Sequence, residues 1–443
     1  MTSKSSGTVS RRSVLKRGAA VAGGAALLGG RETVAAQAAA QAGGIPGPRQ
    51  TNLVGAKFRA FVRHGTTSSL EELTLLPIQP REVVVRTQAT PVCYTITAGA
   101  TAKTPARRVE ILNHSGMGVV EAIGAQVKRV QPGDRVIVAG TPWCGQCYQC
   151  LQGRGDMCRW LFIDPHASAE MSDGTQVMAG VGGLAEKMIV YEDYCCPVFT
   201  DVPSAELTML ADTAGTGLAA GMDLIRIHPG SDVVVLGAGP VGMAAVQSAR
   251  IMAAGQIIVV EPIKYRRDIA LKLGATTVVD PNAEGNNLVA RIRELCKGTT
   301  ERAFAGGIGG AFGRGADFTI EAVGGETSVP KVERGPDPTG TVALQQAFQI
   351  TKGGGHIVTL GFQQQGNVSF PAAQFANIGR TFHAGQQGGL NMMRDLPRFV
   401  KLIEKGLFDV KSMVTATYPL ERTMEAIEAV AGRTTLGAVV TFS

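Results

Sequence analysis

The pattern of apolar and polar residues divides the chain into a β-rich first half and an alternating second half. Residues 57–62 and 82–86 alternate in the manner of half-exposed strands, and a third strand at 135–138 follows a Pro-Gly-Asp turn at 132–134. Helical periodicity is scarce in this part of the chain. The first half is therefore predicted to form a β-rich domain.

The second half opens on an apolar run at 233–236, which is typical of a buried parallel strand. A G-x-G-x-x-G sequence follows directly and opens a predicted helix at 244–253. The first glycine permits the tight turn, the second lets the backbone approach a pyrophosphate, and the third lets the helix pack on the strand. The free N–H groups of the helix N-terminus favour phosphate. The candidate cofactor-binding residues of this turn are Gly237, Gly239, Pro240, Val241 and Gly242. The alternative is a plain glycine-rich turn between a strand and a helix.

Glu261 ends the next predicted strand, 256–261, where an acid holds the ribose hydroxyls of a dinucleotide. A carboxylate there would repel the 2′-phosphate of NADP, so we expect NAD. Arg266, on a predicted helix at 266–273, is positioned to reach the adenosine end of the cofactor. The alternative for Arg266 is a solvated charge on the helix surface.

The remaining pattern extends this alternation of strands and helices. Strands are predicted at 277–280, 317–324, 353–361 and 437–442, and helices at 288–296, 395–405 and 420–430. A glycine-rich insertion at 298–315 and a charged, proline-containing surface loop at 329–340 interrupt it. The succession predicts an α/β fold with a doubly wound parallel sheet, the Rossmann coenzyme domain.

Length and charge narrow the class of protein. The 443 residues allow two domains, and a hydrophobic fraction of 44% suffices for their cores. The formal charge is +7, but six basic residues against one acidic residue in the first 42 positions account for +5 of it. The remainder of the chain, at +2, has no basic tract that would indicate a nucleic acid partner.

The N-terminus carries paired arginines, Arg11-Arg12, followed by 13 small or apolar residues at 18–30. Candidate A-x-A cleavage sites lie at 36–38 and 40–42. The segment 1–42 resembles a twin-arginine export signal, which implies the twin-arginine translocation machinery as a partner and a periplasmic or extracellular location. The alternatives are a membrane anchor, for which the apolar stretch is too short, and a disordered tail.

Four cysteines lie close together in sequence, with the spacing C-x-x-C-x-x-C-x7-C. They are Cys144, Cys147, Cys150 and Cys158. Four thiolates this close can surround one tetrahedral zinc ion. Disulfides are the alternative in an exported chain, whereas folding before export in a reducing compartment favours zinc. The other cysteines outside the predicted sites, Cys195, Cys196 and Cys296, are expected to be core thiols.

Nearly the whole chain after residue 42 resembles the zinc-dependent medium-chain alcohol dehydrogenases, in the order of that family's motifs. In T-P-V-C-Y-T, Cys93 matches the first ligand of the catalytic zinc and Thr95 the hydroxyl that relays the substrate proton. In N-H-S-G-M-G, His114 matches the second ligand. Asp212 takes the place of the third ligand, and Thr216 belongs to the T-G pair that follows it at the start of the coenzyme domain.

The same resemblance implies the fold and its division. It implies a β-rich GroES-like catalytic domain at 51–213 with a structural zinc lobe at about 142–160, an NAD-binding domain at 214–363 and a return segment at 364–443. An insertion at 161–183 is expected to reshape the cleft or an interface. Two zinc ions per subunit and a homodimer or homotetramer are also implied.

Two positions depart from the family pattern. Ser115 replaces the glutamate that follows the ligand histidine, and Ala98 stands where many members have the histidine that ends the proton relay. His166 lies in an insertion near the cysteine cluster, but nothing in the sequence places it in the site. Proton release must therefore use another group or water.

The predicted function is hydride transfer between an alcohol, or an aldehyde or ketone, and NAD. Zinc would act as a Lewis acid on the substrate oxygen. Outside the cytoplasm free NAD is scarce, so the cofactor is expected to stay tightly bound and to be re-oxidised by a second substrate or an external electron acceptor. The alternatives are a reductase of activated double bonds or quinones that has lost its catalytic zinc, and a non-catalytic exported nucleotide-binding protein.

Overall fold

The computed structural model describes residues 53–161, 166–296, 313–362 and 365–443. The predicted export signal at 1–42 and most of the insertion at 298–315 lie outside these residues. None of the helices in the described ranges is both long and apolar enough to cross a membrane.

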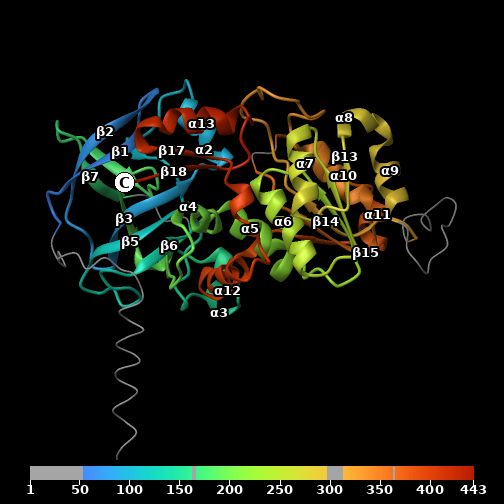
Figure 1. Ribbon diagram of the computed structural model, residues 1–443, viewed down its shortest axis with the longest axis horizontal. Coiled ribbons are helices and arrows are strands. Elements are labelled where there is room, and N and C mark those ends of the chain that lie inside the picture. The colour runs from blue at the N-terminus through green and yellow to red at the C-terminus, as the bar shows by residue number, and fades with distance from the viewer. Residues whose placement is uncertain (1–52, 162–165, 297–312, 363–364) are drawn as a thin grey trace, which may run out of the picture. The chain divides into compact units, whose positions relative to one another are not determined.

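The first part of the chain forms a small closed barrel (Figure 1). Its strands, in order, are β1 (Lys57–His64), β2 (Thr67–Leu75), β7 (His166–Glu170), β8 (Gln176–Ala179) and β4 (Glu110–Ile111). The alternation in β1 buries Phe58, Ala60 and Val62 in the barrel interior, as the sequence predicted. The described part of the expected insertion at 161–183 supplies β7 and β8. These strands complete the barrel, and the expectation that this stretch reshapes the cleft or an interface stays a prediction.

A second sheet of the catalytic domain joins the two ends of the chain. Its order is β10 (Cys195–Pro197), β6 (Arg135–Val138), β5 (Gly116–Ile123), β3 (Glu82–Pro91), β18 (Ala438–Thr441) and β17 (Ala416–Pro419), and β9 (Lys187–Tyr191) also pairs with β3. The closing strand β18 runs antiparallel to β3, with Val440 opposite Thr90. The end of the chain therefore rejoins the catalytic domain through the pairing of β18 with β3.

The coenzyme domain is a six-stranded sheet in which every pair is parallel. Its order is β13 (Thr277–Val279), β12 (Gln256–Val260), β11 (Asp232–Leu236), β14 (Ala316–Glu321), β15 (Thr351–Thr359) and β16 (Thr381–His383). The sequence runs outward in both directions from β11 and β14, so the topological switch point lies between them. Its helices are α6 (Pro240–Ile251), α7 (Lys264–Leu273), α8 (Pro281–Glu284), α9 (Leu288–Leu295), α10 (Thr341–Ile350) and α11 (Ala372–Asn377). The predicted doubly wound sheet is confirmed.

The parallel sheet extends beyond the predicted end of the coenzyme domain. The sequence placed that end at residue 363, but β16 pairs with β15 through His383. Three residues with no long apolar run give too weak a strand signal to be assigned from sequence.

The junction between the two domains is a continuous apolar core. It joins Met117 and Ile137 of the second sheet to Val233 of β11 and to Leu396 and Phe399 of α12 (Met392–Glu404). Each such side chain contributes about 1.5–3 kcal/mol when fully buried. Among the described residues, the remaining α-helices are α2 (Tyr94–Thr101), α3 (Tyr148–Leu151), α4 (Ser204–Leu207), α5 (Thr213–Ala219) and α13 (Thr423–Ala431). Cys195, Cys196 and Cys296 are buried, as expected of core thiols, and burial raises the pKa of each.

Candidate active site

Three side chains from separate parts of the chain converge beside the domain junction. Cys93 precedes the first turn of α2, in extended backbone. His114 follows Asn113, whose left-handed backbone (φ 79°) is stabilised by side-chain hydrogen bonds to Thr90 and the Pro91 carbonyl. Asp212 immediately precedes α5. Local turns therefore aim all three side chains at one point.

The donor atoms of Cys93, His114 and Asp212 all lie within 4.8 Å of one another. Nε2 of His114 is 3.2 Å from Oδ2 of Asp212. Loss of hydration lowers the pKa of His114, but the charges of Asp212 and Cys93 outweigh it and raise that pKa well above its usual value. Burial raises the pKa of Asp212, and the facing His114 more than reverses it. Such a cluster favours a positive charge at its centre.

A thiolate, an imidazole and a carboxylate are a donor set that suits zinc with one coordination position open to substrate. The hydroxyls of Ser115 and Thr213, which directly follow two of these residues, are buried and have no hydrogen-bond partner in the described structure. The predicted residues therefore fit the metal. The position after His114 carries the small, uncharged Ser115, where the family pattern has a glutamate.

Thr95 lies next to this cluster. Its hydroxyl donates a hydrogen bond to Sγ of Cys93 at 3.1 Å. Thr95 and Cys93 line one pocket. Among the described residues that line this pocket there is no histidine. His166 lies in the barrel, where it pairs with Glu82, and is not in the site.

Gln387 is a residue of this site that the sequence did not indicate. It lies in the turn before α12 with a left-handed backbone (φ 45°), and its Nε2 donates to Oδ1 of Asp212 at 3.2 Å and to the Ala211 carbonyl at 3.3 Å. Its Oε1 accepts a hydrogen bond from Thr141. A glutamine pair in a glycine-rich turn has no pattern that would have singled out Gln387.

The glycine-rich turn lines the pocket that Cys93 and Thr95 also line. Gly237 has a left-handed backbone (φ 88°), and a Cβ on Gly242 would lie 1.9 Å from the Gly237 carbonyl oxygen, so α6 packs directly on the turn. Gly237, Gly239, Pro240 and Val241 line the pocket. Gly242 packs beneath it. Thr216 is not among the lining residues, because its hydroxyl donates to the Asp212 carbonyl within α5.

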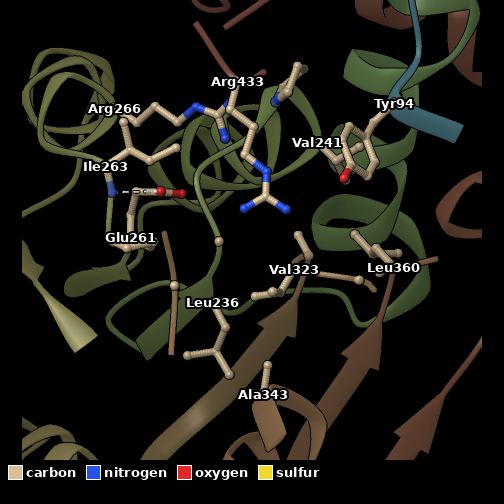
Figure 2. Close-up of a pocket in the computed structure, with 18 of the residues that line it drawn as sticks. Tyr94, Leu236, Val241, Glu261, Ile263, Arg266, Val323, Ala343, Leu360 and Arg433 are labelled. Carbon is tan, nitrogen blue, oxygen red and sulfur yellow. Dashed lines mark hydrogen bonds between the residues drawn. The ribbon is translucent and has the colours of Figure 1, made fainter. Parts of the chain in front are cut away.

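Glu261 lies just beyond β12 and is 3% exposed. One carboxylate oxygen accepts a hydrogen bond from the N–H of Ala238 at 2.7 Å, and the other from the N–H of Ile263 at 3.0 Å. Figure 2 shows this side chain at the wall of the pocket. The carboxylate therefore connects the glycine-rich turn to the segment that follows β12.

Two arginines reach into the pocket from opposite domains (Figure 2). Arg266 is the predicted one, on α7. Arg433 was not predicted; it follows α13 with a left-handed backbone (φ 57°), and its guanidinium lies 5.6 Å from the ring centre of Tyr94. Burial raises the pKa of Tyr94, but a hydrogen bond with Thr327 and the charge of Arg433 lower it overall. The pocket therefore carries positive charge beside the glycine-rich turn, where a pyrophosphate would lie.

The four-cysteine cluster forms a separate lobe, with all four Sγ atoms within 4.8 Å of one another. The Sγ atoms of Cys144 and Cys150 are 3.9 Å apart. Tetrahedral zinc with Zn–S bonds of about 2.3 Å places its sulfurs about 3.8 Å apart, whereas a disulfide needs about 2.05 Å. Burial raises the pKa of Cys147, but N–H donors from Arg159 and Cys150 lower it to about 6. The lobe therefore fits a structural zinc.

Known proteins match both of the domains that form this site. Residues 79–204 match the alcohol dehydrogenase GroES-like domain, and residues 240–333 match the zinc-binding dehydrogenase domain. The chain is 27% identical over 374 residues to an alcohol dehydrogenase class-3 of Myxine glutinosa, covering 81% of this chain and 90% of that protein. It is 28% identical over 332 residues to a geraniol dehydrogenase of Castellaniella defragrans, covering 72% and 80%. The crystal structure of a benzyl alcohol dehydrogenase from Acinetobacter calcoaceticus superposes with a TM-score of 0.72 at 26% identity, covering 87% of this chain and 99% of that one.

Proposed function

We propose that this chain is an alcohol dehydrogenase-like oxidoreductase of the zinc-type medium-chain family and that it uses NAD and two zinc ions per subunit. The two matched domains and the relatives support this proposal. The substrate class is a primary or secondary alcohol, or the corresponding aldehyde or ketone. The reductase and non-catalytic alternatives are not favoured by these relatives.

When bound, zinc supplies Lewis acidity toward the substrate hydroxyl, and NAD accepts the hydride. Cys93, His114 and Asp212 would hold the metal, with Gln387 orienting Asp212 through its amide. The hydroxyl of Thr95, which lines the pocket, is placed to accept the substrate proton. No histidine stands in the described pocket wall to carry that proton further, so we assign its release to water.

The single observation that carries this function is that both predicted machineries share one pocket. Cys93 and Thr95 from the catalytic domain line the same pocket as Gly239 and Glu261 from the coenzyme domain. A ligand that extends along this pocket would reach from the glycine-rich turn to the metal cluster. Glu261 supports NAD over NADP by charge.

The test is metal analysis combined with turnover of a panel of alcohols. We expect two zinc ions per subunit and oxidation of alcohols with NAD as hydride acceptor. One zinc ion, together with reduction of activated double bonds, would support the reductase alternative. A protein that binds its ligand fully but turns over no alcohol, both as the wild type and as Cys93→Ala, would support the non-catalytic alternative.

We also propose that residues 1–42 direct the chain through the twin-arginine route to a periplasmic or extracellular location. The paired Arg11-Arg12 and the short apolar stretch after them support this proposal. Fusion of residues 1–42 to a reporter protein tests it, with Arg11→Lys/Arg12→Lys as the matched control. Retention of the wild-type fusion in the cytoplasm would contradict it.

A homodimer or homotetramer is the expected assembly, which the mass of the native protein in solution would test.

A further inference from the structure

The segment Gly324–Gly340, between β14 and α10, is a loop whose two end regions contribute to the lining of the cofactor pocket. The sequence predicts a surface loop over its larger part, 329–340. Its two ends lie against each other: the N–H of Glu326 donates to the Pro338 carbonyl at 2.7 Å, and a Cβ on Gly340 would lie 2.5 Å from the Gly324 backbone. An ion pair between Arg334 and Glu326 (3.1 Å) closes the loop internally. We call residues 325–339 the strap.

The strap leaves the coenzyme domain and bonds to the catalytic domain. The N–H of Thr327 donates to the Tyr94 hydroxyl at 2.9 Å, one residue after Cys93. The N–H of Lys331 donates to the Gly432 carbonyl at 2.9 Å, one residue before Arg433. Both anchor points therefore adjoin residues that line the pocket.

The strap then returns to the coenzyme domain over the adenosine side of the pocket. A carboxylate oxygen of Glu333 accepts a hydrogen bond from the N–H of Lys264 at the start of α7, and the Arg334 carbonyl accepts one from Asn282 in α8. Gly335, Pro336 and Asp337 then form part of the pocket wall itself. The strap thus bonds to both domains and also contributes lining.

A second contact across the cleft acts with the strap. The hydroxyl of Tyr265, on α7, donates to the Arg433 carbonyl at 2.8 Å. A dinucleotide held on the glycine-rich turn would lie in the pocket that Gly335, Pro336 and Asp337 of the strap line, and these contacts oppose separation of the two domains around it. Separation requires the strap bonds to Tyr94 and Gly432 to break.

We propose that the strap retains the nucleotide as a resident cofactor, so that the protein transfers hydride from one alcohol to a second carbonyl compound without free NAD. This inference rests on the proposed dehydrogenase function. An alcohol gives its carbinol hydride to bound NAD+ and releases a proton, and becomes a carbonyl compound. An aldehyde then takes the hydride from bound NADH and a proton from water, and becomes an alcohol. The nucleotide returns to NAD+, so the atoms and electrons balance with the aldehyde as oxidant.

The experiment uses the full chain, purified without added nucleotide. NAD(H) is counted after denaturation, and the native protein is incubated with benzyl alcohol deuterated at the carbinol carbon and with unlabelled hexanal. We expect close to one nucleotide per subunit and deuterium on carbon 1 of the hexanol formed, with no NAD+ added.

The matched variant replaces residues 327–337 with Asn-Gly, a two-residue turn that fits the contact between Glu326 and Pro338. We expect this variant to be isolated without nucleotide and to transfer deuterium only when NAD+ is added. If it fails to fold, Glu333→Ala/Arg334→Ala removes the hydrogen bond from Lys264 to the strap and the ion pair of Arg334 with Glu326 inside the strap. We then expect bound NADH to leave roughly tenfold faster, the factor set by one or two net hydrogen bonds. Val329→Ser, at a strap position that is 71% exposed, is the control and should behave as wild type.

The outcomes separate the strap from the proposed function. Wild-type protein that is isolated empty and oxidises alcohols only with added NAD+ would overturn retention and keep the dehydrogenase. Nucleotide that is retained equally after removal of the strap would overturn the role of the strap. Loaded wild-type protein whose NAD+ no alcohol in the panel reduces would keep retention and reject the dehydrogenase. Bound NADH that hexanal fails to re-oxidise, but that an artificial electron acceptor does, would overturn hydride transfer to a carbonyl.

Discussion

The side-chain amide of Gln387 donates a hydrogen bond to Oδ1 of Asp212, while Oδ2 of the same carboxylate faces His114. One oxygen is thereby fixed and the other is left toward the metal cluster. Partners of this kind set the orientation of a ligand, and their loss costs about 10–100-fold in metal affinity.

Gln387→Asn should weaken zinc binding at the Cys93 cluster by roughly tenfold. Asparagine tolerates the left-handed backbone at this position, but its shorter side chain withdraws the amide from Asp212. Competition with a chelator measures the zinc affinity, which should fall for one of the two zinc ions. Gln386→Ala is the control, and equal zinc affinity in the two variants would show that the Gln387 contact is only incidental.

Asp212→Ala should lower the zinc content from two to one per subunit and abolish alcohol oxidation. Removing the carboxylate leaves two ligands, too few to hold catalytic zinc. Metal analysis beside a turnover assay measures both effects. Two zinc ions in the purified variant would place the catalytic metal elsewhere.

Cys158→Ser should remove the other zinc ion and lower the melting temperature, while the Cys93 cluster keeps its metal. Cys158 is 2% exposed, within a lobe whose apolar contacts are mostly the other cysteines and two tryptophans. Without metal the lobe has little else to bury. Thermal melting with and without a chelator measures the loss, and a wild-type protein insensitive to thiol alkylation after chelation would indicate disulfides instead.

Glu261→Ala should weaken NAD binding and relax the preference for NAD over NADP. The change removes the acceptor of two backbone N–H bonds, each worth about 1.5–3 kcal/mol when the partner is charged, and it removes the charge that repels a 2′-phosphate. Binding of each nucleotide to nucleotide-free protein measures the ratio. Glu294→Ala, on the exposed face of α9, is the control.

The protein should lose stability as the pH falls below about 6.5, in part through His356 and His383. Nδ1 of His356 and Nε2 of His383 are 3.0 Å apart, and burial lowers the pKa of both histidines. Histidines with depressed pKa values in the folded state take up protons more readily when unfolded, so their contribution is present above the unfolded pKa and is lost as the pH falls toward the folded one. Melting temperatures between pH 7.5 and 5 measure this. His383→Gln should flatten the profile, and an unchanged slope would assign the acid sensitivity to other groups.

The sequence by itself determined the coenzyme domain and the ligand types. The apolar run before Gly237 and the period of the helices are local signals, so β11, α6 and β12 followed from them. The spacing of Cys144 to Cys158 is equally local, because four ligands within fifteen residues need no distant partner.

Only the tertiary structure decided which distant residues meet. Cys93, His114 and Asp212 had to be joined by family resemblance in the sequence, whereas in the fold their donor atoms come within 4.8 Å because β3, the turn after β4 and α5 meet at the domain junction. Gln387, Arg433 and the strap carry no periodicity, and each acts through contacts with segments far away in sequence. Short loops and lone polar residues leave no repeating pattern, so their partners are set by packing of the two domains and not by the local chain.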